Sequence, residues 1–118
     1  MAPRGLQRLP KTARLRKRRE FLQLAKTGSK NQSEHFVVIS RSNSSGECRL
    51  GITVSGKVGN SVTRNRIKRH VREFFRRRRA DWQPGADFVV IARKGAAALS
   101  GGAIAAELAT AFAGRRAF

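Results

Sequence analysis

The first hydrophobic pattern in the chain is helical and runs from about residue 15 to residue 26. At 100° per residue its apolar side chains share one arc of the helix, and these are Leu15, Leu22 and Ala25, with Phe21 at the edge. Gly28 follows as the stop signal of this helix. Two prolines and a glycine interrupt the residues before it. We therefore predict an extended basic arm over residues 1–13 and a single domain over residues 14–118.

Three later segments have the patterns of β-strands. Residues 35–41 are rich in β-branched side chains, and residues 87–93 form a continuous apolar run, which is typical of a buried strand. Residues 49–55 alternate. Their core side carries Leu50, Ile52 and Val54, and the opposite side carries Arg49, Gly51, Thr53 and Ser55. The second set is small and polar, so it predicts an open sheet face with room for a ligand. The pattern also allows a short extra strand near Lys30.

Two further helices are predicted in the second half of the chain. One covers about residues 63–80, after a glycine-containing loop, and the other follows Gly101 and Gly102. The order helix, strand, strand, helix, strand, helix, with the optional extra strand, predicts an α+β protein: a two-layer α/β sandwich with helices packed on a small mixed sheet. Residues 96–114 are weakly hydrophobic and contain Glu107, so we interpret them as a packed helix and not as a membrane span.

The helix over residues 63–80 combines an apolar stripe with a row of polar donors. The stripe recurs at helical spacing and comprises Ile67, Val71, Phe74 and Phe75. An adjoining arc of about 140° carries Arg64, Asn65, Lys68, Arg69, Arg72 and Arg76. Packing of the stripe would hold these donors outward, and guanidinium groups bind phosphate oxygens in pairs. Glu73 is the only acid among nine basic residues between 64 and 79, so ion pairs within the helix do not explain the row.

The distribution of charge indicates a polyanionic partner. The chain has 118 residues, with 26 Lys+Arg and 7 Asp+Glu, and a net charge of +19. Residues 1–33 carry a net +9 and residues 64–79 a net +8, and nearly neutral strand sequence separates them. Repulsion within so small a body is offset by an anionic partner. Nucleic acid is the favoured partner. The alternatives are a merely solvated helix face and an anionic membrane, which would require an exposed apolar face beside the charges.

Other classes of protein are disfavoured. Cys48 is the only cysteine, which excludes a disulfide framework and favours a reducing compartment. His35 and His70 lie far apart without neighbouring carboxylate clusters, so we expect no protein-borne metal site. No hydrolase, zinc-protease or P-loop motif is present, and no paired carboxylates suggest acid–base catalysis or a small-molecule substrate. The arginine-rich N-terminus lacks the apolar segment of a secretory signal and fits a nucleic-acid arm better than a transit peptide.

One ordered set of motifs resembles a known family. The segment RNRIKRHVRE, at residues 64–73, resembles the signature helix of the protein component of bacterial ribonuclease P. The match continues upstream through RLGITVSGKVGNSVT, and it includes RLRKRREFLQLAKTG and DFVVIARKG, so it covers about residues 9–112. The resemblance implies a sandwich like domain 2 of ribosomal protein S5, with a left-handed crossover. It also implies a cytoplasmic bacterial protein that binds the catalytic RNA one to one, and whose other partner is precursor tRNA.

In that family the RNA carries out the hydrolysis that removes the 5′ leader, and it holds most of the Mg²⁺. The resemblance implies a leader-binding cleft between the first helix and the sheet, formed here by Phe21, Val37, Ile39, Thr53 and Lys57. It assigns RNA and phosphate contacts to Arg64, Asn65, Arg66, Lys68, Arg69, Arg72 and Arg76. Asn65 is a candidate for an indirect contact with an RNA-held metal ion; no direct metal ligand and no catalytic side chain are expected in the protein.

Three positions depart from the family pattern. Ala25 stands where many members have a second aromatic residue, Ile39 where some have tyrosine, and Gly56 where lysine is frequent. These departures reduce the stacking surface, so we expect leader binding to be more electrostatic. Two alternative functions share the same composition: a structural RNA-binding protein of the ribosome or its assembly, and a DNA-compacting protein.

Overall fold

The computed structural model describes residues 18–43, 48–78 and 85–113. The predicted arm at residues 1–13 lies outside these ranges. The elements in chain order are α1 (Arg18–Thr27), β1 (Ser29–Gln32), β2 (Phe36–Ser42), β3 (Arg49–Thr53), α2 (Ser61–Arg78), β4 (Ala86–Ala92), the 3₁₀-helix η4 (Lys94–Ala98) and α3 (Gly101–Ala113). The predicted order is confirmed, and the optional strand near Lys30 is present as β1.

The four strands form one mixed sheet in the order β1-β2-β4-β3. β1 pairs antiparallel with β2, and β2 pairs antiparallel with β4, whereas β3 and β4 are parallel. Parallel neighbours require a crossover connection, which α2 provides between β3 and β4. β3 is therefore an edge strand, and it leads directly through a short loop into the basic helix.

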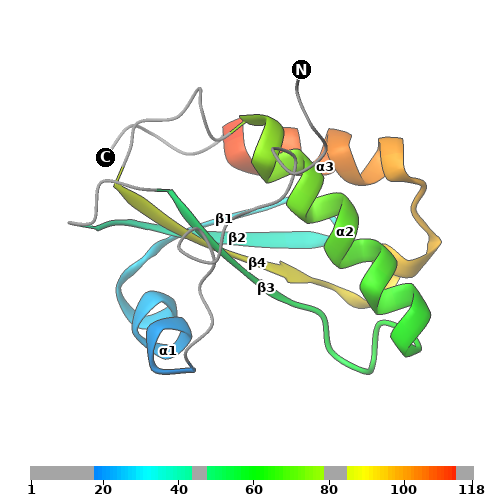
Figure 1. The fold of residues 1–118 in the computed structure, drawn as a ribbon, viewed down its shortest axis with the longest axis horizontal. Coiled ribbons are helices and arrows are strands. Elements are labelled where there is room, and N and C mark those ends of the chain that lie inside the picture. Colours follow the sequence, from blue (N-terminus) through cyan, green and yellow to red (C-terminus); the bar gives the residue numbers. More distant parts are fainter. Residues whose placement is uncertain (1–17, 44–47, 79–84, 114–118) are drawn as a thin grey trace, which may run out of the picture.

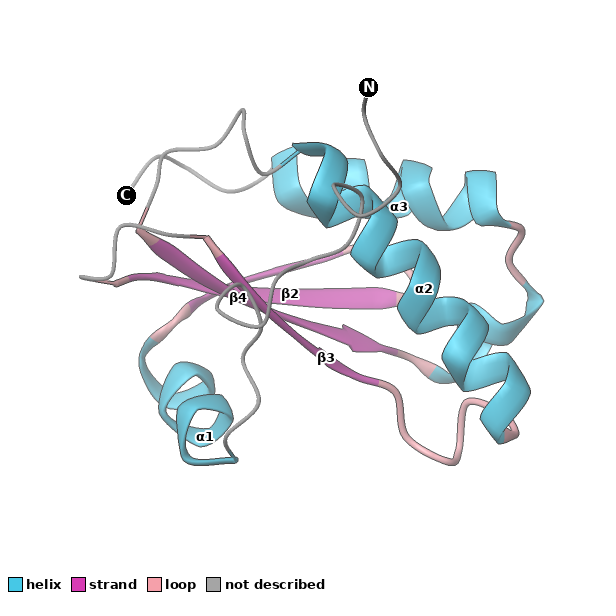
Figure 2. Cartoon of the chain, viewed as in Figure 1, coloured by secondary structure: helices cyan, strands magenta, loops and turns pink. Residues whose placement is uncertain are grey.

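Helices lie on both faces of the sheet (Figures 1 and 2). α2 and α3 cover one face, and α1 lies against the other. The larger core is formed where α2 and α3 meet the sheet, and the apolar stripe predicted for α2 is buried there: Ile67, Val71, Phe74 and Phe75. Phe88 from β4 joins this core, with its ring centroid 5.7 Å from that of Phe75 and 5.2 Å from that of Phe112. This packing fixes the rotation of α2 about its own axis.

The smaller core under α1 corrects one prediction. Leu24, which is 1% exposed, packs against Ile39 and Val89, whereas Leu22 is 52% exposed. The predicted arc containing Leu22 was therefore wrong. Two leucines two positions apart differ by about 200° around a helix, so only one of them can face the sheet. The hydrophobic pattern of so short a helix does not indicate which of the two leucines is buried.

The C-terminal segment is divided into two elements. A 3₁₀-helix over Lys94–Ala98 precedes α3, which buries Ile104, Leu108 and Phe112 against the sheet. The packed helix predicted within residues 96–114 is thus confirmed, although η4 was not predicted. None of the helices described in the structure is long and apolar enough to cross a membrane.

Candidate nucleic-acid interface

The sheet face that carries α1 is only partly covered. The strand register aligns one row of residues across all four strands, from Gln32 through Val37 and Ile91 to Thr53. Val37 and Ile91 are half-buried, and the residues at the two ends of the row are exposed. The neighbouring row is covered by Leu24 of α1. An open strip with an apolar centre therefore runs across the sheet beside α1.

The structure brings some of the predicted cleft residues together and separates others. Val37 and Thr53 lie in this open row, and Lys57 is exposed in the turn that follows β3. Ile39 faces the same side but is 3% exposed, because α1 covers it. Phe21 lies within α1, but its side chain is outside those that the structure describes.

Sequence reasoning missed three residues of this strip. Ile91 was interpreted only as part of a buried run, yet it lies at the centre of the open row. Gln32 ends the row on β1, and Arg93, which directly follows β4, donates a hydrogen bond to the Gln32 side-chain oxygen. Only the pairing register places these residues beside Val37, so no local sequence signal could have found them.

A buried carboxylate organises the opposite end of the same sheet face. Asp87 is 1% exposed, and Arg49 binds it through two hydrogen bonds, Nε to Oδ1 at 2.8 Å and a terminal nitrogen to Oδ2 at 2.9 Å. Asn43 also donates to Oδ1 at 2.5 Å, and a terminal nitrogen of Arg41 lies 3.7 Å from Oδ2. Two guanidinium groups therefore share one carboxylate, which closes this end of the sheet with a net positive charge.

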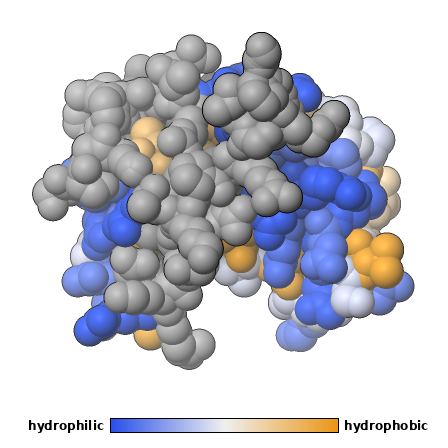
Figure 3. All heavy atoms as spheres, in the orientation of Figure 1, coloured by the Kyte–Doolittle hydropathy of each residue, from blue (hydrophilic) through white to orange (hydrophobic). Residues whose placement is uncertain are grey.

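The outward face of α2 carries most of the predicted phosphate-binding row. Asn65, Arg69 and Arg72 are exposed at helical spacing, opposite the buried stripe. Arg64, Lys68 and Arg76 are half-buried beside them. The described surface at the right of the space-filling view is mainly hydrophilic (Figure 3).

Arg66 differs from the rest of the predicted set. Its terminal nitrogens donate to the backbone oxygens of Leu99, at 3.2 Å, and Ala97, at 3.1 Å. These bonds turn its guanidinium inward, toward the end of η4, and tie α2 to the segment before α3. The helix spacing alone did not distinguish Arg66 from its outward neighbours.

The N-terminus of α2 is held by a side-chain cap. Asn60 accepts a hydrogen bond from the backbone N–H of Thr63 through its Oδ1 atom at 2.9 Å, as N-cap residues do. The next residue, Arg64, is half-buried, and its Nε atom is buried without a hydrogen-bond partner. Such an unsatisfied buried donor costs about 1–3 kcal/mol in the free protein.

The described residues contain no group of three or more His, Cys, Asp or Glu side chains that could hold a metal ion. Two carboxylates, Asp87 and Glu107, are instead engaged in holding the fold. Glu107 accepts hydrogen bonds from the Ser33 hydroxyl and the His35 backbone N–H, both at 2.8 Å, and its Oε2 lies 2.5 Å from His35 Nδ1. Burial tends to raise the pKa of Glu107, but these hydrogen bonds outweigh it and leave the pKa below its ordinary value.

The mixed sheet, its open strip and the basic face of α2 define a small α+β protein with a candidate nucleic-acid interface. The family model described as Ribonuclease P matches residues 9–115. The chain belongs to the ribonuclease P protein family and is the protein subunit of a ribonucleoprotein endoribonuclease that matures tRNA 5′ ends. The family resemblance of the sequence is thereby confirmed.

Individual relatives agree with this assignment. The ribonuclease P protein component of Citrifermentans bemidjiense is 45% identical over 103 residues, which is 87% of this chain and 88% of the relative. That of Thermotoga maritima is 49% identical over 81 residues, 69% of each chain. Among solved structures, the Staphylococcus aureus RNase P protein superposes with a TM-score of 0.80 at 34% identity, covering 86% of this chain and 93% of that one. The Thermotoga maritima protein gives 0.74 at 40% identity, covering 82% and 92%.

Proposed function

We propose that the chain binds the catalytic RNA of ribonuclease P through α2 and binds the 5′ leader of precursor tRNA along the open strip of the sheet. Its role is to promote leader removal by a complex that contains one copy of each subunit. The proposal rests mainly on one observation: α2 has two opposite faces, of which one is buried in the core and the other carries the basic row.

Contact with the catalytic RNA is supported by the rigidity of this row. The buried stripe fixes the rotation of α2, so Asn65, Arg69 and Arg72 project from a framework that does not need to order on binding. Arginine side chains bind phosphate groups with directional hydrogen bonds. Within the described part of α2, Glu73 is the only acid, so the face retains its positive potential.

Contact with the leader is supported by the shape and chemistry of the strip. A single strand of RNA presents flat bases and charged phosphates. Val37 and Ile91 offer a half-buried apolar surface against which bases can pack. Lys57 follows β3 and Arg93 follows β4, and both are exposed, so their positive charges are available to bind phosphates. Because Ile39 is covered by α1, the apolar surface is narrow, and binding depends largely on charge.

The strip and the helix are connected through β3. Thr53 ends the open row at the edge strand, and the chain passes from there through Lys57 to the cap of α2. An RNA strand that leaves the sheet at this edge therefore approaches the basic helix. This arrangement would bring the leader and the catalytic RNA together at the cleavage site.

Mg²⁺ belongs to the proposal as an ion that is held mainly by the RNA. When bound, it supplies charge stabilisation and an activated water for phosphodiester hydrolysis. Asn65 is exposed on the RNA-facing side of α2, and its amide could orient a water of such an ion. We place the protein in the bacterial cytoplasm as part of the same proposal.

The test is reconstitution of the full chain with a bacterial ribonuclease P RNA and labelled precursor tRNA at near-physiological magnesium. Thr53→Glu places a carboxylate at the end of the open row, and Ala106→Glu adds the same charge at an exposed position of α3. A unit charge near a phosphate costs about 1 kcal/mol even in water. Thr53→Glu should therefore weaken binding of a long-leader substrate about fivefold, and Ala106→Glu should not.

Leader length separates the possible outcomes. A substrate with a one-nucleotide leader should bind both variants equally if the strip holds the leader. Equal weakening for both leader lengths would exclude the strip as the leader site. If the chain fails to improve cleavage while it binds ribosomal RNA equally well, the structural ribosomal alternative replaces the proposed function.

A further inference from the structure

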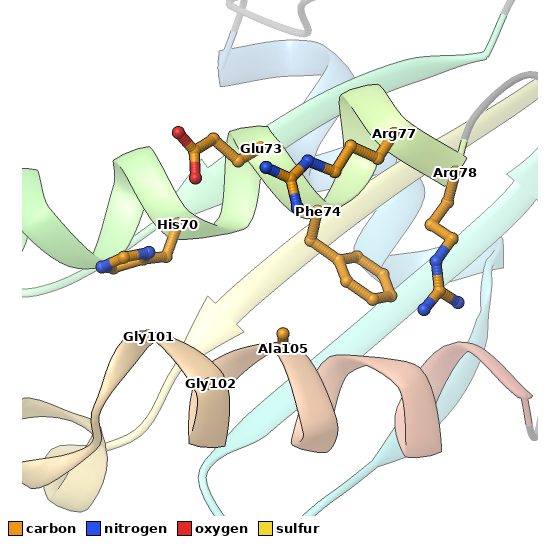
Figure 4. A pocket seen from close by; sticks show the side chains of 8 residues that line it. All are labelled: His70, Glu73, Phe74, Arg77, Arg78, Gly101, Gly102 and Ala105. Atoms are coloured by element: carbon orange, nitrogen blue, oxygen red, sulfur yellow. The ribbon is translucent and has the colours of Figure 1, made fainter.

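A notch lies between α2 and α3 (Figure 4). Its lining includes His70, Glu73 and Arg77, which at 100° per residue lie on the side of α2 away from Arg64 and Lys68. Its volume is about 380 Å³, at the lower end of the range for ligand-binding pockets. The residues that form its α3 wall are Gly101, Gly102 and Ala105. None of these was included in the predicted RNA-binding set.

The notch exists because the α3 wall has almost no side chains. The His70 ring packs directly on Gly101, where an added Cβ would lie 2.6 Å from the ring Cε1 atom. An added Cβ on Gly102 would meet nothing within 4 Å. The methyl group of Ala105 points from α3 toward α2 (Figure 4). Larger side chains at these positions would therefore fill the space.

The α2 side of the notch is rich in cations. Arg77 is exposed and makes no hydrogen bond or ion pair with any residue that the structure describes. The Arg78 guanidinium carbon lies 4.8 Å from the centre of the Phe74 ring, and this stacking orients the group while leaving its edges available for hydrogen bonds. Two guanidinium groups thus line the α2 side of the notch, and the α3 side opposite them has almost no side chains.

The carboxylates near the notch are directed elsewhere. Glu73 contributes to the lining, but its carboxylate points away from α3 (Figure 4). Glu107 is the only acid in α3, and it is bound to Ser33 and His35 on another side of that helix. Glu73 lies one helical turn before Arg77 and also lines the notch, but no hydrogen bond or ion pair joins a described carboxylate to Arg77 or Arg78.

We propose that this notch binds a phosphate group of the catalytic RNA through Arg77 and Arg78, so that RNA contacts α2 from both flanks. The inference rests on the proposed function because it takes the same RNA as its ligand. Arg66 belongs to neither contact, since its guanidinium is bound to the carbonyl oxygens of Ala97 and Leu99. The notch faces α3, whereas the outward row lies opposite the buried stripe, so they are two distinct contacts.

The test uses variants of the full chain that change the notch without touching the outward row. Ala105→Glu places a carboxylate beside Arg77 and Arg78, and Ala105→Leu fills the space without charge. Ala106→Glu is the matched control, since it makes the same change at the next, exposed position of α3. Loss of a charged hydrogen bond corresponds to about a tenfold change in affinity. Both Ala105 variants should weaken binding of a bacterial ribonuclease P RNA by about that factor relative to Ala106→Glu.

Arg77→Gln provides a second measurement that does not depend on filling the notch. It should reduce the slope of log affinity against log salt by about 0.7–0.9, the value for one phosphate contact. Circular dichroism of each variant checks that α2 and α3 remain folded. Equal RNA affinity for Ala105→Glu and Ala106→Glu, with the fold intact, would overturn the proposal.

Two further comparisons are needed. One separates binding of an RNA phosphate from binding of free phosphate, and the other separates failure of the notch contact from failure of the proposed function. Titration with inorganic phosphate should shift the amide resonance of Gly102 in the wild-type chain and not in Ala105→Glu. Such a shift together with unchanged RNA affinity would mean that the notch takes free anions only, which overturns the RNA contact. If Arg69→Ala weakens RNA binding and the notch variants do not, this inference fails and the proposed function stands. If no variant matters, including Arg69→Ala, the proposed function fails as well.

Discussion

Arg66 and Arg69 lie three residues apart on α2, and we expect their replacement by alanine to have opposite consequences. Both substitutions remove one positive charge from the same helix, so they are a matched pair for long-range electrostatics. Arg66 donates to the carbonyl oxygens of Leu99 and Ala97. Arg69 is exposed and has no hydrogen bond or ion pair to the described part of the chain. Arg66→Ala should therefore affect the fold, and Arg69→Ala should affect RNA binding.

The magnitudes follow from these contacts. Arg66→Ala removes two charged hydrogen bonds from a half-buried site and leaves two carbonyl oxygens without their partner. The expected loss is about 1–3 kcal/mol in the free energy of unfolding, a noticeable fraction of the roughly 5–15 kcal/mol that stabilises a domain. Arg69→Ala, at an exposed position, should change this free energy by less than about 0.5 kcal/mol. In RNA binding the order reverses: Arg69→Ala removes one phosphate contact and lowers the salt slope by about 0.7–0.9.

The assays are urea denaturation of each variant and titration of the catalytic RNA between low and moderate salt. Arg66→Ala should lower the denaturation midpoint and retain the wild-type salt slope once the protein is folded. A reduced slope for Arg66→Ala, equal to that of Arg69→Ala, would refute the reasoning, because it would mean that Arg66 leaves the η4 carbonyls to bind RNA. An unchanged slope for Arg69→Ala would exclude a phosphate contact at that position.

Three further outcomes are expected. Asp87→Asn should lower the free energy of unfolding by about 3–5 kcal/mol in urea denaturation, because it breaks a buried ion pair, whereas Glu34→Gln, at a side chain that is 83% exposed, should change it by less than about 0.5 kcal/mol; similar effects of the two would contradict a structural role for the buried carboxylate. The stabilising contribution of Glu107, whose pKa is lowered from 4.5, should be present at neutral pH and disappear as the pH falls through that lowered pKa, so the stability difference between wild type and Glu107→Gln should vanish in acid; a difference that persists at low pH would argue against the charged contact with His35. The Ser40 hydroxyl is buried without a hydrogen-bond partner, so Ser40→Ala should raise the free energy of unfolding by about 1 kcal/mol, and a clear loss of stability would show that the hydroxyl has a partner.

The prediction of α2 succeeded because all of its determinants are local. An apolar stripe at helical spacing defines both the helix and its buried side, and Ile67, Val71 and Phe75 are buried as expected. The direction of the outward row then follows from helix geometry. The same argument could not separate Arg66 from Arg69, since the difference between them depends on η4, an element that the sequence pattern did not reveal.

The composition of the open strip, in contrast, could not be predicted from local sequence. Gln32, Val37, Ile91 and Thr53 come from four strands, and only the strand order β1-β2-β4-β3 aligns them. Alternation indicated the side of β3 on which Thr53 lies but carried no information about its neighbours on another strand. α1 posed a similar problem: which of Leu22 and Leu24 is buried depends on how the helix lies across Ile39 and Val89, and not on its own periodicity.

The α2 helix stays positive in part because two other acids, Asp87 and Glu107, are used for folding. Asp87 is bound by Arg49 in the sheet, and Glu107 is bound by His35 and Ser33 beside α3. Each of these carboxylates is therefore neutralised within the fold, away from the outward side of α2. Glu73 is the only acid within α2, so the repulsion among the basic residues of this helix is reduced when an anion binds. Because a ligand that binds only the folded state stabilises it, RNA binding and folding of this chain are expected to support each other.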